Sequence, residues 1–106
     1  MAAPVLPQHA RVVIIGGGII GCSVAYHLAH MGCTDVVLIE RDRLTSGTTW
    51  HAAGLIVTFG STSETSTEMR KYTRDLYARL EAETDVATGF KAVGFIEIAA
   101  DRDRRG

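Results

Sequence analysis

The sequence predicts an α/β fold: a Rossmann-like βαβ unit of a doubly wound parallel sheet, incomplete in this chain, then a helix and the start of a second sheet. Three observations predict it. A β-branched run, Val12 to Ile15, is followed at once by a glycine cluster with G-x-G-x-x-G spacing, and a second β-rich run, Val36 to Ile39, ends at the acid Glu40. Helical periodicity separates the two runs, as in a dinucleotide-binding unit.

Residues 1–10 are expected to form a leader ahead of this unit. They show no basic n-region, long apolar segment or arginine-rich amphipathic pattern, so we expect neither a secretory signal nor a transit peptide. The longest stretch without polar residues, Val12 to Ile20, is far shorter than the roughly 20 residues that span a bilayer. Lys plus Arg number 11 against 12 for Asp plus Glu, so no strong field attracts nucleic acid or an anionic membrane. We expect neither partner.

Each glycine of the motif has a physical role in such a unit. Gly16 allows the tight turn out of the first strand, and Gly18 leaves no Cβ to block a pyrophosphate. Gly21 lets the following helix pack closely against that strand. The helix N-terminus then presents unpaired N–H groups and a positive dipole end to the phosphates. We therefore predict that these three glycines bind the cofactor.

The helix and the second strand complete the unit. The helix is predicted by an apolar stripe at Ile20, Val24, Leu28 and Met31, and Gly32 is placed to end it. Glu40 lies nineteen residues past Gly21, where its carboxylate would accept hydrogen bonds from the adenosine ribose hydroxyls. Its charge disfavours a 2′-phosphate and hence NADP. Arg41, the next residue, is assigned to the same cofactor-binding set.

The cysteines and two histidines of this unit are interpreted as structural. Cys22 and Cys33 lie near opposite ends of the helix, about 16 Å apart at a rise of about 1.5 Å per residue, so no disulfide joins them. They are read as packing residues in a reducing compartment, the cytoplasm or a mitochondrial matrix, with a catalytic thiol as the lesser alternative. His27 and His30 could share a metal, but with no third ligand nearby we expect a solvated pair and no metal site.

After Glu40 the composition changes to a loop rich in Thr, Ser and Gly. Ser46, Thr48 and Thr49 could bring hydroxyls and backbone N–H groups to a ribose or pyrophosphate. Gly54, with the small residues before it, would permit the close approach of a flat ring. From composition alone, a surface loop with an incidental histidine, His51, remains open beside a cofactor loop.

A second helix is predicted from Ser61 to Asp85. Ser61 and Glu64 have the capping-box spacing, and one apolar stripe recurs at helical intervals. The stripe consists of Met69, Tyr72, Leu76 and Leu80.

A strand is predicted from Phe95 to Ala99, where side chains alternate after the glycines at 89 and 94. We read it as the first strand of a second sheet. Residues 61–106 are therefore interpreted as a helix and strand that lead into a further, truncated domain. With too few strands for a doubly wound sheet, the chain is interpreted as a fragment.

Three stretches together carry a family resemblance: VVIIGGGIIGCSVAYHLAHMG, VVLIERDRLTSGTTWHAAGL and LEAET…GF…GFIEIAA. They resemble the N-terminal part of the sarcosine and dimethylglycine dehydrogenases, among the glycine-oxidase-like FAD oxidoreductases, over residues 11 to about 100. The TSGTTWHAAGL segment is more restrictive than the glycine motif. The family usually has Glu-Thr-Gly where this chain has Glu83-Thr84-Asp85.

The resemblance implies FAD as the cofactor, with residues 11–60 as the FAD-binding unit and its flavin-contacting loop, and a substrate domain beginning in residues 61–106. In this family the histidine of WHAAGL carries FAD covalently through the flavin 8α-methyl group, which maps onto His51. A neutral imidazole is a competent nucleophile toward the electrophilic tautomer of that methyl group. The alternative is a histidine that only packs against the ring.

The resemblance also implies the oxidation of N-methyl amines such as sarcosine or dimethylglycine. A hydride equivalent passes from the N-methyl carbon to the flavin, with electron-transfer flavoprotein or oxygen as the acceptor and formaldehyde or a folate-bound one-carbon unit as the product. No catalytic residue is assigned within this chain. Two alternatives stay open: a non-catalytic relative resembling the regulatory subunit of pyruvate dehydrogenase phosphatase, against which Trp50-His51 argues, and a plain NAD-binding module, which has no reason to carry the TSGTTWHAAGL loop.

Overall fold

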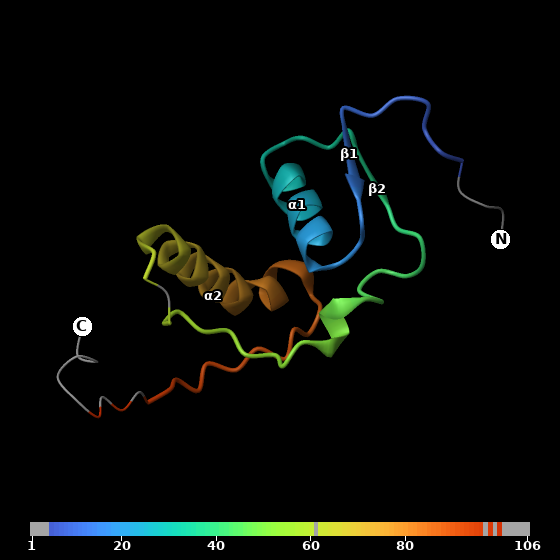
Figure 1. The fold of residues 1–106 in the computed structure, drawn as a ribbon. Coiled ribbons are helices and arrows are strands. Elements are labelled where there is room, and N and C mark those ends of the chain that lie inside the picture. Colours follow the sequence, from blue (N-terminus) through green and yellow to red (C-terminus); the bar gives the residue numbers. More distant parts are fainter. Residues whose placement is uncertain (1–4, 61, 97, 99, 101–106) are drawn as a thin grey trace. The chain divides into compact units, whose positions relative to one another are not determined.

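The computed structural model describes residues 5–60, 62–96, 98 and 100, which divide into two compact units, Met1–Gly54 and Leu55–Gly106. Each unit is described by itself. The first contains β1 (Val12–Ile15), α1 (Ile19–His30), β2 (Val36–Ile39) and a 3-10 turn, η1 (Thr48–His51), and the second contains α2 (Glu64–Thr84) (Figure 1). Among the described residues, no helix is both long and apolar enough to cross a lipid bilayer.

The first unit is the predicted βαβ unit. Its strands β1 and β2 pair in parallel, with Val12 opposite Val36 and Ile15 opposite Ile39. The connecting helix α1 packs against both strands. Because the strands are parallel and in this register, their carboxyl ends meet at one edge of the sheet. The glycine-rich loop and Glu40 therefore leave the sheet as neighbours.

The ends of α1 lie where the glycines predict them. The helix starts directly after Gly18 and ends at His30. Gly32 follows in the left-handed region, with φ +89°, and its N–H donates to the carbonyl of Ala29 at 3.0 Å. A residue with a Cβ is strained there, so glycine terminates the helix at little cost.

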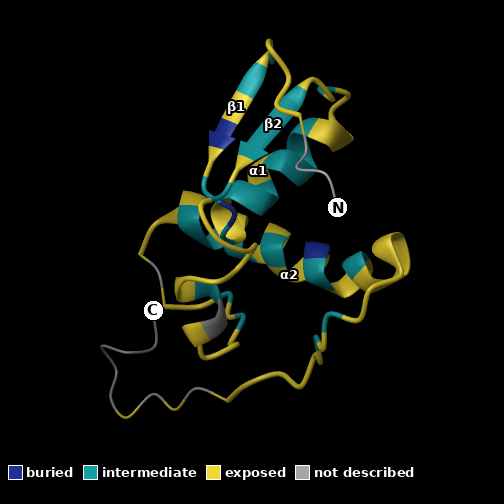
Figure 2. Ribbon diagram, turned by 90° about the vertical axis from the view of Figure 1, so that its right-hand side faces the viewer, coloured by how far each residue is buried: buried dark blue, intermediate teal, exposed yellow. Residues whose placement is uncertain are grey.

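The core of this unit is small. Ile14, at 8% exposure, is its buried apolar residue, whereas Ile15 and Ile20 are 87% and 78% exposed. Figure 2 shows β1, α1 and β2 mostly in the colours of intermediate and exposed residues. A two-stranded sheet with one covering helix leaves the outer edges of both strands and much of one sheet face uncovered. In a complete doubly wound sheet such apolar surfaces are covered by further strands and helices.

In the second unit α2 begins later than the sequence predicted. Ser63 is the N-cap, and its hydroxyl accepts the N–H of Ser66 at 3.4 Å. The predicted start was therefore wrong, and the predicted cap, Ser61, lies outside the described residues. Serine is a favoured N-cap residue at either position, and the capping-box spacing to Glu64 favoured Ser61, so the sequence alone did not select Ser63. The predicted stripe is only partly covered, with Leu76 buried and Met69 exposed.

The predicted strand from Phe95 to Ala99 is not formed by its described residues. Phe95, Ile96 and Ile98 have no strand hydrogen bonding, and residues 97 and 99 lie outside the described part. A strand is defined by pairing with a neighbour, so alternation without a partner strand yields only an extended segment. What the unit does form is an aromatic contact, since the Phe95 ring stacks on Phe59 with centroids 4.1 Å apart.

The end of α2 gives a first testable prediction. Asp85 caps the helix in the left-handed conformation, with φ 57° and ψ 27°, and its N–H donates to the carbonyl of Glu81 at 2.9 Å. That conformation costs a non-glycine residue roughly 1 kcal/mol, and an acid at a helix C-terminus opposes the helix dipole. We expect Asp85→Gly to stabilise this helix end by about 0.5–1 kcal/mol.

The measurement is the helicity of a synthetic peptide of residues 62–90, followed by far-ultraviolet circular dichroism. Asp85→Asn is the matched control, because it removes the charge and keeps a side chain that tolerates the left-handed region. Glycine should raise helicity more than asparagine does. Equal gains for the two variants would assign the effect to charge instead of backbone conformation.

Candidate functional site

The glycine-rich loop is anchored where β1 ends. The N–H of Gly16 donates to the carbonyl of Ile39 at 2.8 Å, which extends the pairing of the two strands by one bond. Gly16 itself has φ +106°, a conformation that side chains rarely adopt. The chain can therefore turn sharply from the strand toward α1, as the sequence predicted.

Gly21 lets α1 lie against this loop. A Cβ built on Gly21 would lie 1.9 Å from the carbonyl oxygen of Gly16 and 3.4 Å from the Cγ2 atom of Ile14. The first contact is with backbone, which cannot rotate away. The packing role predicted for Gly21 is confirmed, and any contact of these glycines with a cofactor stays a prediction.

Glu40 reaches back to the glycine-rich loop. Its Oε2 atom accepts the N–H of Gly17 at 2.7 Å, and its Oε1 atom accepts the N–H of Asp42 at 3.1 Å. These bonds, the Gly17 bond foremost, and the positive charge of Arg41 hold the pKa of the Glu40 carboxyl below its usual value. An ionised carboxylate offers about four acceptor positions, so it can also accept from ribose hydroxyls.

Gly17 is the site residue that the sequence reasoning missed. Besides its bond to Glu40, its carbonyl accepts the N–H of Thr45 at 2.9 Å. A Cβ on Gly17 would lie 2.6 Å from the Cδ2 atom of Leu44. The available signal was the run of three consecutive glycines, one more than the motif requires between Gly16 and Gly18.

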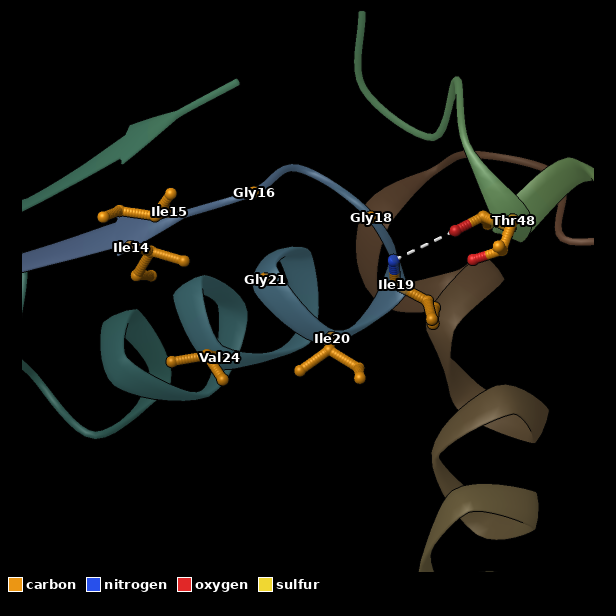
Figure 3. Close-up of a pocket in the computed structure, with 10 residues that line it drawn as sticks. Ile14, Ile15, Gly16, Gly18, Ile19, Ile20, Gly21, Val24 and Thr48 are labelled. Carbon is orange, nitrogen blue, oxygen red and sulfur yellow. Dashed lines mark hydrogen bonds between the residues drawn. The ribbon is translucent and has the colours of Figure 1, made fainter. Parts of the chain in front are cut away.

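Thr49 comes to the start of α1 from η1. Its Oγ1 atom accepts the N–H of Ile19 at 3.2 Å (Figure 3). Gly18, the N-cap residue of α1, has no side chain to cap the helix, so the first helical donor is satisfied by this distant hydroxyl. A hydroxyl that accepts one hydrogen bond keeps its own hydrogen to donate, and a phosphate oxygen is a suitable acceptor.

These parts surround a pocket that has a polar and an apolar end (Figure 3). The polar end is formed by Gly16, Gly18, Ile19, Thr48 and Thr49, and the apolar end by Ile14, Ile15, Ile20, Gly21 and Val24. The polar end lies at the N-terminus of α1, which suits an anionic group. The apolar end is lined by side chains of β1 and α1.

His51 is the last residue of η1, and its side chain is exposed. Its Nδ1 atom lies 3.0 Å from the carbonyl oxygen of Gly47. A carbonyl can only accept, so Nδ1 carries the hydrogen in this bond and the lone pair of the neutral ring is on Nε2. Whether His51 binds a cofactor stays a prediction.

The remaining predicted cofactor residues are less closely placed. The structure brings Glu40 and Thr49 to the glycine-rich loop but leaves Arg41, Ser46 and Gly54 in exposed positions of the chain after β2. Arg41 acts on Glu40 through its backbone N–H and its positive charge, both of which lower the pKa of the Glu40 carboxyl. The assignment of these three residues to the cofactor stays a prediction.

The cysteines and histidines of α1 have local contacts. Neither Cys22 nor Cys33 is in a disulfide, and the Cys22 Sγ atom lies 3.5 Å from the carbonyl oxygen of Gly17. The His27 Nδ1 atom is 2.7 Å from the Ser23 carbonyl oxygen, and the His30 ring stacks on Tyr26. The described residues contain no cluster of three or more His, Cys, Asp or Glu side chains arranged for a metal ion.

Comparison with known proteins agrees with this geometry. Residues 11–106 match the family described as FAD dependent oxidoreductase. The chain is 48% identical over 100 residues to human (Homo sapiens) mitochondrial sarcosine dehydrogenase, and 45% identical over 104 residues to the mitochondrial dimethylglycine dehydrogenase of Rattus norvegicus. It is also 46% identical over 99 residues to the mitochondrial pyruvate dehydrogenase phosphatase regulatory subunit of Mus musculus.

These matches cover 93%, 95% and 93% of this chain, respectively, but only 11%, 12% and 11% of the relatives. The chain therefore spans about a tenth of the length of the curated relatives it matches. The similarity reaches the glycine-rich loop, Glu40 and the loop that carries His51, and it extends over α2.

Proposed function

The chain belongs to the FAD dependent oxidoreductase family, and we propose that it forms the FAD-binding part of an enzyme that oxidises an N-methyl amine such as sarcosine or dimethylglycine. The observation that carries this proposal is the conjunction at the end of β1: the glycine-rich loop, the N-terminus of α1 and the Glu40 carboxylate meet at one edge of the sheet. The similarity to sarcosine and dimethylglycine dehydrogenases supports the substrate class.

The residues present fit FAD. Gly16 and Gly18 leave the backbone accessible at the first turn of α1, where a Cβ on Gly18 would meet nothing closer than the Thr49 hydroxyl at 3.5 Å. This turn and Thr49 would hold the pyrophosphate, and Glu40 would accept from the ribose hydroxyls. The ionised Glu40 side chain disfavours a cofactor with a 2′-phosphate.

Bound FAD supplies the acceptor for the two electrons that leave the N-methyl carbon. The residues of this chain bind and orient the cofactor. We assign none of them to amine deprotonation or to recognition of the substrate carboxylate. We propose electron-transfer flavoprotein or oxygen as the final electron acceptor, and formation of hydrogen peroxide during turnover distinguishes the two. We also propose a mitochondrial matrix location, which the mitochondrial relatives support.

We further propose that His51 holds the flavin covalently through Nε2 and the 8α-methyl group. The bond of Nδ1 to the Gly47 carbonyl supports this assignment, because it directs the lone pair to Nε2. In the complete protein, we expect acid denaturation to leave the yellow colour on the polypeptide. We expect His51→Ala to release all of the flavin under the same treatment.

The control variant is His30→Ala, which removes an imidazole from the end of α1 and should leave the flavin attached. Retention of flavin by His51→Ala equal to that of the unaltered protein would overturn the linkage. Reduction of the bound flavin by sarcosine or dimethylglycine, seen as loss of absorbance at about 450 nm, tests the amine oxidation separately.

A second candidate function is a non-catalytic regulatory role, favoured by the 46% identity to the phosphatase regulatory subunit. Sequence identity over this region does not separate the two functions, because the values for the enzymes are nearly the same. Flavin that is bound but not reduced by any N-methyl amine would favour the regulatory role. A plain NAD-binding module would carry no flavin absorbance at all.

A further inference from the structure

The backbone N–H and the backbone carbonyl of Gly17 are both hydrogen-bonded to the chain that follows β2. We propose that Glu40 is a positioning residue for the pyrophosphate-binding loop: its carboxylate fixes Gly17 and so sets the loop's shape, in addition to any bond that it makes to the ribose. The inference rests on the proposed FAD site.

The hydrogen bonds form a link between two loops. On one side the Gly17 N–H donates to Glu40 Oε2 at 2.7 Å, and on the other the Gly17 carbonyl accepts the Thr45 N–H at 2.9 Å. The second carboxylate oxygen is held by the Asp42 N–H at 3.1 Å. The carboxylate therefore joins the loop after β1 to the loop after β2. Charge-assisted bonds of this kind are about twice as strong as neutral ones.

Thr45 adopts an unfavourable conformation that maintains this link. It has φ +61°, in the left-handed region that a β-branched residue rarely enters. Such a conformation persists when surrounding contacts over-determine it, and it is common beside functional sites. Here it accompanies the bond from the Thr45 N–H to the Gly17 carbonyl.

Steric space explains why position 17 is a glycine. A Cβ there would lie 2.6 Å from Leu44 Cδ2, 3.2 Å from Glu40 Cβ and 3.3 Å from Glu40 Oε2. The Leu44 methyl group can rotate away, whereas the two Glu40 contacts require Glu40 to shift by a few tenths of an ångström. Glu40 thus favours glycine at position 17, a reason separate from the close approach of a phosphate at Gly18.

Electrostatics favours the same role. A carboxylate and a nearby pyrophosphate repel each other, and hydrogen-bond donors that bind the carboxylate offset part of this repulsion. The backbone N–H groups of Gly17, Asp42 and Arg41, the Gly17 bond foremost, and the Arg41 charge stabilise the ionised Glu40, which holds its pKa below the usual value. The charge can therefore remain close to the phosphate loop and shape it.

The test separates the loop role from the ribose role by changing the ligand as well as the protein. It uses the complete protein in a His51→Ala background, freed of flavin, with ADP and 2′,3′-dideoxy-ADP as probes in calorimetric titrations. The dideoxy probe keeps the phosphates and lacks both ribose hydroxyls. We expect Glu40→Ala to weaken both probes, the dideoxy probe by about tenfold.

Asp42→Ala is the matched control, since it removes a carboxylate from the same loop and keeps the N–H that binds Glu40. It should change the affinity of either probe by less than about twofold. Glu40→Gln keeps an oxygen for the Gly17 N–H and should recover part of the dideoxy-ADP affinity. A Glu40→Ala variant that weakens ADP but binds dideoxy-ADP as the parent does would overturn the proposal and leave Glu40 a ribose ligand only.

A second variant approaches the link from the other side. Gly17→Ala combined with Leu44→Ala removes the 2.6 Å contact and leaves the new methyl group against Glu40. We expect it to weaken dideoxy-ADP binding, and we expect Glu40→Ala to add little further loss in this background, because both changes break one link. Fully additive losses would contradict the proposal.

Hydrogen exchange tests the link without any ligand. In the complete protein, the peptide that contains Gly17 should exchange faster in Glu40→Ala than in Asp42→Ala, and equal rates would count against the proposal. If the parent protein bound neither probe, the FAD site itself would be refuted, and the inference with it. Binding by the parent with unchanged dideoxy-ADP affinity in Glu40→Ala would refute the positioning role alone.

Discussion

Gly21→Ala is expected to abolish FAD retention and to lower the free energy of unfolding of the complete protein by about 3 kcal/mol or more. The new Cβ would lie 1.9 Å from the Gly16 carbonyl oxygen, far inside van der Waals contact. Alanine gains about 1 kcal/mol in helix propensity over glycine, but that gain is smaller than the cost of separating α1 from the loop. The loop and the helix N-terminus must shift apart, and both are parts of the proposed pyrophosphate site.

Gly18→Ala is the paired variant. Its Cβ would make only an ordinary contact, 3.5 Å from the Thr49 hydroxyl. We expect a nearly unchanged midpoint of urea unfolding and a loss of FAD, because the methyl group would stand where the pyrophosphate approaches. Bound flavin per polypeptide and the unfolding midpoint are the two measurements. A Gly21→Ala protein as stable as the parent would show that α1 and the loop are not held as closely as the structure places them.

The βαβ unit could be predicted from sequence because its signals are local. The change from a strand period to a helix period occurs within the residues that form each element, and Gly32 ends α1 where it stands in the sequence. The position of Glu40 also follows from local pattern, since it is the residue after β2. Its negative charge is the basis for the prediction that it accepts hydrogen bonds from the ribose hydroxyls.

The roles of Gly17 and Thr49 could not be predicted in the same way. Gly17 bonds to a residue 23 positions away, and Thr49 bonds to one 30 positions away. Nothing in the local pattern states which of several hydroxyls will cap α1. Thr48, Thr49 and Ser46 are equivalent by composition, and only the path of the chain after β2 selects Thr49.

The errors in the second unit have the opposite origin. There the local signals were present but lacked the tertiary partner that decides between them. Alternating side chains near Phe95 predicted a strand, and no described neighbour pairs with that segment. The left-handed conformation at Asp85 shows the same limit, because the local sequence does not state which residue after the helix will adopt a conformation that glycine adopts most easily.

The exposed apolar surface of the first unit is explained by the order of strands in a doubly wound sheet. In the usual order 3-2-1-4, the first strand pairs with a further strand on the edge opposite the second. The apolar end of the pocket is lined by Ile15 of β1 and by Ile20 and Val24 of α1 (Figure 3). We therefore interpret this part of the pocket as packing surface for another strand and the polar end as cofactor surface.

This interpretation leads to the second large prediction: the 106-residue chain studied alone should show no cooperative unfolding transition and at most weak, reversible FAD binding. Among the described apolar residues only Ile14 and Leu76 are buried, each at 8% exposure. Folding stability is a small difference between large terms, and chain entropy of about 1–2 kcal/mol per ordered residue must be offset mainly by apolar burial. Two buried side chains cannot supply that offset.

The measurements are a thermal scan by near-ultraviolet circular dichroism and equilibrium dialysis against FAD, with the complete protein as the comparison. We expect a broad loss of signal without a midpoint for the chain alone, and strong fluorescence of a hydrophobic dye, since side chains such as Ile15 are exposed. The same chain should show no amine oxidation. A sharp melt with stoichiometric uptake of FAD would mean that these residues bury far more apolar surface than the structure shows, and that β1, α1 and β2 need no further strand to form a stable cofactor site.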